Sequence, residues 1–131
     1  MKLTARLVAG ALALLLATSV SAQLAALKQT TPQQRATILT DIMKKRLNLS
    51  GEQLTKVSAL NLQYANKAQP ILDGANRPLE EMREMKQLNE QKEADLKNVL
   101  TPAQFTEYQA AKEEIRQKFE QHIMHGGGNA P

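Results

Sequence analysis

Apolar residues recur at intervals of three and four along four stretches of this chain, at residues 31–47, 50–68, 78–100 and 101–125. This spacing places the apolar side chains on one face of a helix in each stretch. No stretch alternates apolar and polar residues with a period of two, so we expect no sheet. The pattern predicts an all-α protein, with four amphipathic helices in two pairs around a proline-bearing connector at residues 69–78.

The helix starts contain a repeated motif. Its first copy is Leu49, Ser50, Gly51, Glu52 and Gln53, and its second copy, 51 residues later, is Leu100, Thr101, Pro102, Ala103 and Gln104. Both copies read L-[ST]-x-x-Q, which is the pattern of a capping box. The hydroxyl accepts a hydrogen bond from the third helical amide, and the glutamine at that third position bonds back to the N–H of the cap. Each copy therefore predicts a sharp corner between two helices.

The first 22 residues have the pattern of a cleaved secretory signal peptide. Two basic residues precede an uncharged apolar run at residues 7–17, and the small residues before Gln23 suit cleavage there. The run is too short to anchor the protein in a bilayer. We expect a periplasmic protein with a signal peptide at 1–22, a single helical domain at 23–125 and a disordered glycine-rich tail at 126–131.

With these features the sequence resembles the Spy/CpxP family of periplasmic stress proteins, whose hallmark is a pair of LTxxQ motifs. Leu100 to Gln104 match the motif fully, and Leu49 to Gln53 differ only by serine in place of threonine, which keeps the capping hydroxyl. The resemblance implies a thin, curved helical cradle that dimerises through antiparallel helices. It implies an ATP-independent chaperone that binds unfolded proteins under envelope stress. A zinc-responsive accessory protein and a modulator of a membrane sensor kinase are the alternatives within the family.

Composition argues against enzymes and nucleic-acid binders. The chain has no cysteine, and without Lys2 and Arg6 its net charge falls from +4 to +2. Basic residues are mixed with acidic ones instead of forming one basic face. Carboxylates such as Glu93 lie four residues from a lysine, here Lys97, which is the spacing of solvated ion pairs. We expect no catalytic residues and no cofactor.

The only two histidines, His122 and His125, lie near the glycine-rich tail. They are three residues apart, so on a helix both imidazoles share one face and could bind one Zn²⁺ or Cu²⁺ ion. Two ligands rarely form a tight site without a third. We favour a helix end at which the two rings lie near the last carbonyl groups, and we expect no metal site within one chain.

The third helix is the predicted client-binding element. Met82, Arg83, Met85 and Lys86 combine flexible apolar side chains with charge, which suits weak binding of varied unfolded proteins. An ordinary core stripe with solvated flanks is the alternative interpretation. After residue 22 the chain has 28 large apolar residues, few for four apolar helix faces, so we also expect a homodimer.

Overall fold

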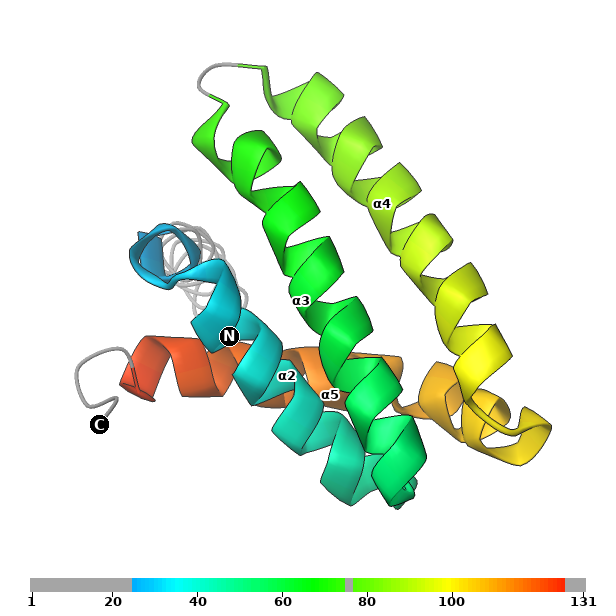
Figure 1. The fold of residues 1–131 in the computed structure, drawn as a ribbon. Coiled ribbons are helices and arrows are strands. Elements are labelled where there is room, and N and C mark those ends of the chain that lie inside the picture. The colour runs from blue at the N-terminus through cyan, green and yellow to red at the C-terminus, as the bar shows by residue number, and fades with distance from the viewer. Residues whose placement is uncertain (1–24, 75–76, 127–131) are drawn as a thin grey trace, which may run out of the picture.

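The computed structural model describes residues 25–74 and 77–126, and within these ranges the protein is helical and has no strand. Short helical turns at residues 25–29 precede four long helices (Figure 1). These are α2 (Pro32–Leu47), α3 (Gly51–Asp73), α4 (Pro78–Val99) and α5 (Pro102–Gly126). The predicted all-α fold is confirmed, with the segment at 25–29 as an element that the pattern did not indicate.

The predicted helix starts are also confirmed. Thr31 caps α2, and Pro32 occupies the first helical position, where the lack of an N–H has no cost. The Thr31 hydroxyl accepts from the Gln34 amide at 3.1 Å, and the Gln34 side chain accepts from the Thr31 N–H at 2.9 Å. The helix ends at Leu47 and is followed by Asn48, whose φ of 52° is the left-handed conformation that commonly terminates helices.

The predicted connector is shorter in the structure than in the sequence analysis. Pro70 was expected to end the second helix, yet α3 continues through it to Asp73. Within a helix, proline removes one N–H and its ring crowds the carbonyl four residues earlier. This loss falls in the last turn of a 23-residue helix, and Gly74 still bonds to the carbonyls of Pro70 and Ile71.

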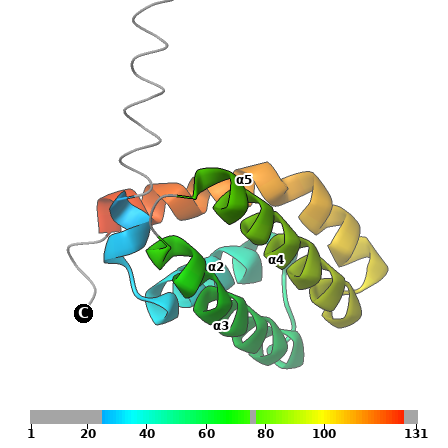
Figure 2. The same cartoon turned by 90° about the horizontal axis from the view of Figure 1, so that it is seen from above.

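The two-pair arrangement needs correction, because α2 and α3 are both central elements. The helix α2 packs against α3 and α5, and α3 packs against α2 and α4. The helices α4 and α5, which the sequence placed together as the second pair, make few contacts with each other. Figures 1 and 2 show α3 and α4 side by side as a hairpin, with α5 crossing behind α2. The helices α4 and α5 do not pair because the sharp corner between them turns α5 away from α4.

The hydrophobic core lies at the end of the molecule where the two helix corners meet. All four long helices contribute its buried side chains, which are Ile42, Met43, Leu47, Val57, Leu96, Leu100, Ala111 and Ile115. By contrast, Leu96 is the only buried residue within α4. The distal part of the α3–α4 hairpin therefore extends beyond the core.

Two predicted segments lie outside the described residues: the signal peptide at 1–22 and the tail beyond Gly126, which itself ends α5. Among the helices that the structure describes, none combines the length and the apolar character that crossing a membrane requires.

Candidate functional site

Both copies of the repeated motif form the predicted capping boxes. In the first copy, the Ser50 hydroxyl accepts from the Gln53 amide at 3.2 Å, and the Gln53 side chain accepts from the Ser50 N–H at 3.1 Å. In the second copy, the corresponding distances between Thr101 and Gln104 are 3.2 and 3.0 Å. Each corner is thus fixed by side-chain bonds to the first turn of the helix that follows it.

The structure adds a contact that the motif alone does not predict, since the two glutamines bind each other. Gln53 Nε2 donates to Gln104 Oε1 at 2.5 Å, and Gln104 Nε2 donates to Gln53 Oε1 at 3.0 Å. Each Nε2 also donates to a backbone carbonyl at the end of a helix. Gln53 Nε2 donates to the Val99 carbonyl of α4, and Gln104 Nε2 donates to the Leu47 carbonyl of α2, both at 3.3 Å. We call this reciprocal pair, Gln53 and Gln104, the glutamine clasp.

The glutamine clasp explains why both motif copies end in glutamine. A capping box alone functions with either glutamate or glutamine. The clasp requires a side chain that donates and accepts at the same time, and a carboxylate only accepts. Gln53 and Gln104 thereby join the two corners, and the motif residues Leu49, Ser50, Leu100 and Thr101 hold them in place. Their arrangement indicates a structural role.

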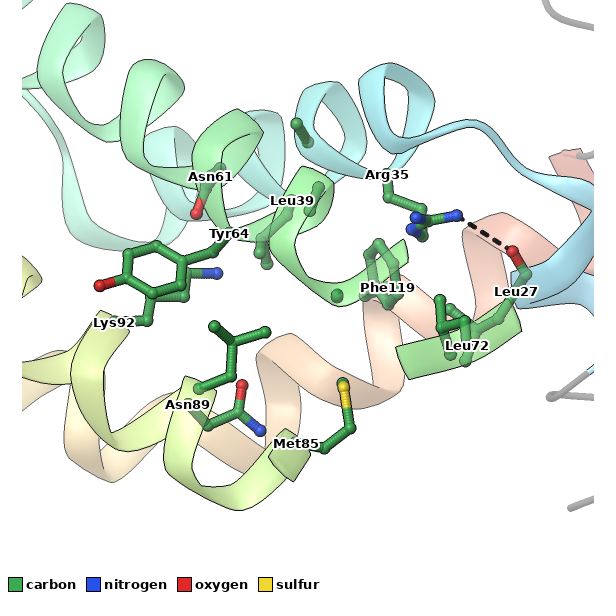
Figure 3. Close-up of a pocket in the computed structure, with 14 residues that line it drawn as sticks. Leu27, Arg35, Leu39, Asn61, Tyr64, Leu72, Met85, Asn89, Lys92 and Phe119 are labelled. Carbon is green, nitrogen blue, oxygen red and sulfur yellow. Dashed lines mark hydrogen bonds between the residues drawn. The ribbon is translucent and has the colours of Figure 1, made fainter. Parts of the chain in front are cut away.

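The candidate binding site is a separate feature, a cavity of about 180 Å³ lined by residues from α2, α3, α4 and α5 and by Leu27. We call it the inter-helix cavity. Its walls are mostly apolar and include Leu39, Ala65, Leu72, Met85, Leu88 and Phe119. Figure 3 shows Leu39 and Arg35 on the α2 side, Met85 and Asn89 on the α4 side, and Phe119 between them.

Arg35 is a buried cation at one end of this cavity, with 5% of its surface exposed. Its guanidinium donates to the carbonyls of Leu27 and Thr30 at 3.1 and 2.5 Å, and to Gln69 Oε1 at 2.6 Å. All three acceptors are neutral. Burial lowers the pKa of Arg35, and Asp73 acts in the opposite direction. These bonds attach the segment before α2 to the last turns of α3.

Asn61 is the most buried polar side chain of the cavity wall, with 1% of its surface exposed. The Thr40 hydroxyl donates to the Ala36 carbonyl at 2.7 Å, so it can only accept from Asn61 Nδ2, which lies 2.9 Å away. This fixes the orientation of the Asn61 amide. Its Oδ1 then has no hydrogen-bond partner in the described part of the chain, and Figure 3 shows this oxygen on the side that faces Tyr64 and Lys92.

Lys92 contributes a second cation to the cavity. Its neighbour Glu93 forms an ion pair with Lys112 of α5 and accepts a hydrogen bond from Gln109, instead of pairing with Lys97 as the sequence suggested. Lys92 itself makes no hydrogen bond or ion pair with the residues that the structure describes. Burial lowers the pKa of Lys92 to about 8, against a smaller opposing effect of Glu93.

Tyr64 completes the polar part of the wall. Its hydroxyl donates to Asp95 Oδ2 at 2.5 Å, and its ring lies 4.8 Å from the ammonium of Lys67. Burial, together with this carboxylate, raises the pKa of Tyr64 to about 12. The tyrosine is therefore neutral at physiological pH and already has its hydrogen-bond partner.

The predicted client-binding residues divide between two locations on α4. Met82 is 68% exposed, and its neighbour Leu79 is 73% exposed, so both lie on the open surface of the hairpin. Met85 is partly buried and lines the inter-helix cavity. Arg83 and Lys86 are exposed, and Lys86 lies 3.9 Å from Glu90. The core-stripe interpretation thus fails for the beginning of α4, because its apolar residues are not buried.

Both histidines lie near carbonyl groups of their own helix. His122 Nδ1 is 2.8 Å from the Lys118 carbonyl, and His125 Nδ1 is 3.0 Å from the Gln121 carbonyl. Because a carbonyl oxygen only accepts, each ring donates through Nδ1 in these contacts. Over residues 25–74 and 77–126, no three histidine or acidic side chains gather into a group that could hold a metal ion.

The family model described as "Domain of unknown function (DUF4890)" matches residues 22–108, which include both motif copies. The chain belongs to this family. No curated protein and no solved structure matches the chain.

Proposed function

We propose that the protein is an ATP-independent periplasmic chaperone that binds unfolded proteins through the α3–α4 hairpin. The observation that carries this proposal is the exposure of Leu79 and Met82 on a helix that buries only Leu96. Large apolar side chains that remain exposed beside charges of both signs suit a surface for weak and varied clients. The LTxxQ-like motifs and the export pattern support the same function through their resemblance to the Spy/CpxP family.

Charge is part of the proposed client surface. Arg83 and Lys86 lie on the same helix as Glu80, Glu81 and Glu84. Charges of both signs attract segments of either charge over several ångströms, and the flexible, exposed Met82 then adapts to the apolar groups of the client. A surface of this kind has no need of a nucleotide or a catalytic residue.

We also propose that the protein works as a homodimer in the periplasm. The extended hairpin leaves apolar surface exposed that a second copy would cover in part. Sedimentation equilibrium of residues 23–131 at micromolar concentration should give twice the chain mass. A monomer mass together with a cooperative thermal transition would reject the dimer and leave the chaperone proposal to its own test.

The chaperone test follows light scattering from a heat-stressed model enzyme with residues 23–131 and without ATP. We expect suppression at equimolar concentration, and a loss of at least half of it in the double variant Leu79→Ser/Met82→Ser. Met124→Ser is the matched control, because Met124 is also exposed, at 43%, but lies on α5. No suppression at stoichiometric excess would reject the proposal, as would equal losses in the double variant and the control.

The same assay tests the zinc-responsive alternative, for which the exposed His122 and His125, three residues apart on α5, are the candidate ligands. In that case suppression would appear only with added Zn²⁺ and would disappear in the variant His122→Ala/His125→Ala. Suppression without zinc, unchanged in this variant, would support the metal-independent chaperone.

A further inference from the structure

The inter-helix cavity has the size and the walls of a site for a small apolar molecule. Its volume of about 180 Å³ exceeds that of an engineered apolar cavity, about 150 Å³, that takes up benzene. Leu39, Leu72, Leu88 and Phe119 surround it from all four long helices. It is separate from the exposed pair Leu79 and Met82, neither of which lines it.

The charges around the cavity bear on which kind of ligand it could bind. Arg35 and Lys92 are both cations, and none of the residues that line this cavity is acidic. An adjoining groove shares Lys92 and contains Glu93 and Glu113, but these carboxylates already pair with Lys112 and Arg116. Lys92 is thus a cation in a largely apolar environment with no carboxylate bound to it, which favours an anionic ligand.

The Asn61 amide provides a second, independent observation. Its oxygen is buried and lacks a donor, and Asn61 shares the cavity wall with Lys92. An unpaired buried acceptor is costly, and an ammonium group has three N–H donors. One of these can donate to Asn61 Oδ1, while the other two remain for an incoming anion. Asn61 and Lys92 together therefore form a polar part of the cavity wall, in addition to Arg35, while the remaining walls are mostly apolar.

We propose that the inter-helix cavity binds a medium-chain alkyl carboxylate, with its tail against Leu72, Leu88 and Phe119 and its carboxylate on Lys92. In the complex, the Lys92 ammonium bridges the ligand carboxylate and Asn61 Oδ1. Arg35 keeps its three neutral acceptors and adds a favourable positive potential. This binding is independent of the proposed chaperone activity, because it uses a different surface of the hairpin.

The test is isothermal titration of residues 23–131 with octanoate below its micelle concentration. We expect octanoate to bind at least tenfold more tightly than octylammonium, which has the same tail and the opposite charge, and acetate not to bind. Lys92→Met should weaken octanoate binding at least tenfold. The variant removes a partly buried charge while keeping most of the apolar stem, so it should remain folded. Lys97→Met, on the exposed side of α4, is the control with unchanged affinity.

Methionine methyl resonances locate the ligand. Met85 lines the cavity, whereas Met82 and Met124 are exposed elsewhere. Octanoate should therefore shift the Met85 methyl signal and leave the other two unchanged. Equal affinities for octanoate and octylammonium, an unchanged affinity of Lys92→Met, or a shift at Met82 without one at Met85 would each overturn the proposal. The last result would assign the binding to the exposed client surface instead.

Discussion

Exchanging the glutamines of the two corners for glutamate separates the glutamine clasp from ordinary helix capping. In Gln53→Glu, a carboxylate oxygen still accepts from the Ser50 N–H and from Gln104 Nε2. The variant loses the two bonds that Gln53 Nε2 donates, to Gln104 Oε1 and to the Val99 carbonyl. It also places a negative oxygen against both of these acceptors.

The size of the effect follows from these losses. Each hydrogen bond contributes about 0.5–1.5 kcal/mol net, and a partly buried acceptor left without a donor costs about 1–3 kcal/mol. We expect Gln53→Glu to lower the free energy of unfolding by about 2–4 kcal/mol. Gln104→Glu should have a similar effect, because it loses the bonds to Gln53 Oε1 and the Leu47 carbonyl.

Gln34 provides the matched control within the same chain. It has the same capping-box role at the start of α2, but it takes no part in the clasp. A glutamate near a helix N-terminus is favourable by about 0.3–1 kcal/mol, so Gln34→Glu should be neutral or slightly stabilising. Urea denaturation at pH 7, followed by far-UV circular dichroism, gives all three free energies of unfolding. Equal changes in Gln53→Glu and Gln34→Glu would refute a stabilising role of the clasp.

Two further predictions concern the cations of the cavity wall, Lys92, which is partly buried, and Arg35, which is buried. Because the pKa of Lys92 falls from 10.5 to about 8 on folding, the folded protein binds fewer protons than the unfolded chain between these values, and stability rises with pH in this range. Lys92→Met should therefore raise the free energy of unfolding by about 2–3 kcal/mol at pH 7 and by less at pH 9.5. Urea denaturation at the two pH values measures both gains. A gain that is the same at both pH values would contradict this prediction. Arg35→Met should lower the free energy of unfolding by about 2–4 kcal/mol, because three acceptors lose their charged donor. Hydrogen exchange of this variant should show the earliest loss of protection near Thr30. Protection near Thr30 equal to that of the wild type would contradict a role of Arg35 in attaching the segment before α2 to α3.

The sequence predicts local features of this protein well and non-local features poorly. Capping boxes and proline positions depend on neighbouring residues, so the helix starts at Pro32, Pro78 and Pro102 follow from the pattern. The course of α3 through Pro70 was not predicted, because a proline signals a break regardless of how the rest of the helix is packed. The packing of α2 against α5 depends on the angle of each corner, which periodicity does not contain.

The candidate site shows the same limit. Asn61 and Lys92 are 31 positions apart, and in the sequence Asn61 is one polar residue on an apolar helix face, while Lys92 is one of many lysines. Only the packing of α3 against α4 brings both to one cavity. The exchange of partner by Glu93, from Lys97 to Lys112, likewise depends on the approach of α5. The one available signal was an asparagine among the apolar positions of a helix.

The reciprocal pairing of Gln53 with Gln104 also bears on how such a chain could have arisen. Each glutamine offers the other the same donor and acceptor that it receives, which is the property of a contact across a two-fold axis. In a shorter chain with one helical corner, the glutamine could form these reciprocal hydrogen bonds only by dimerising with a second copy of the chain. Joining two copies in one polypeptide converts that encounter into an intramolecular one, with an effective concentration on the order of millimolar. Two copies of a five-residue motif, 51 positions apart, are what duplication and fusion of a single self-pairing corner would leave in a sequence.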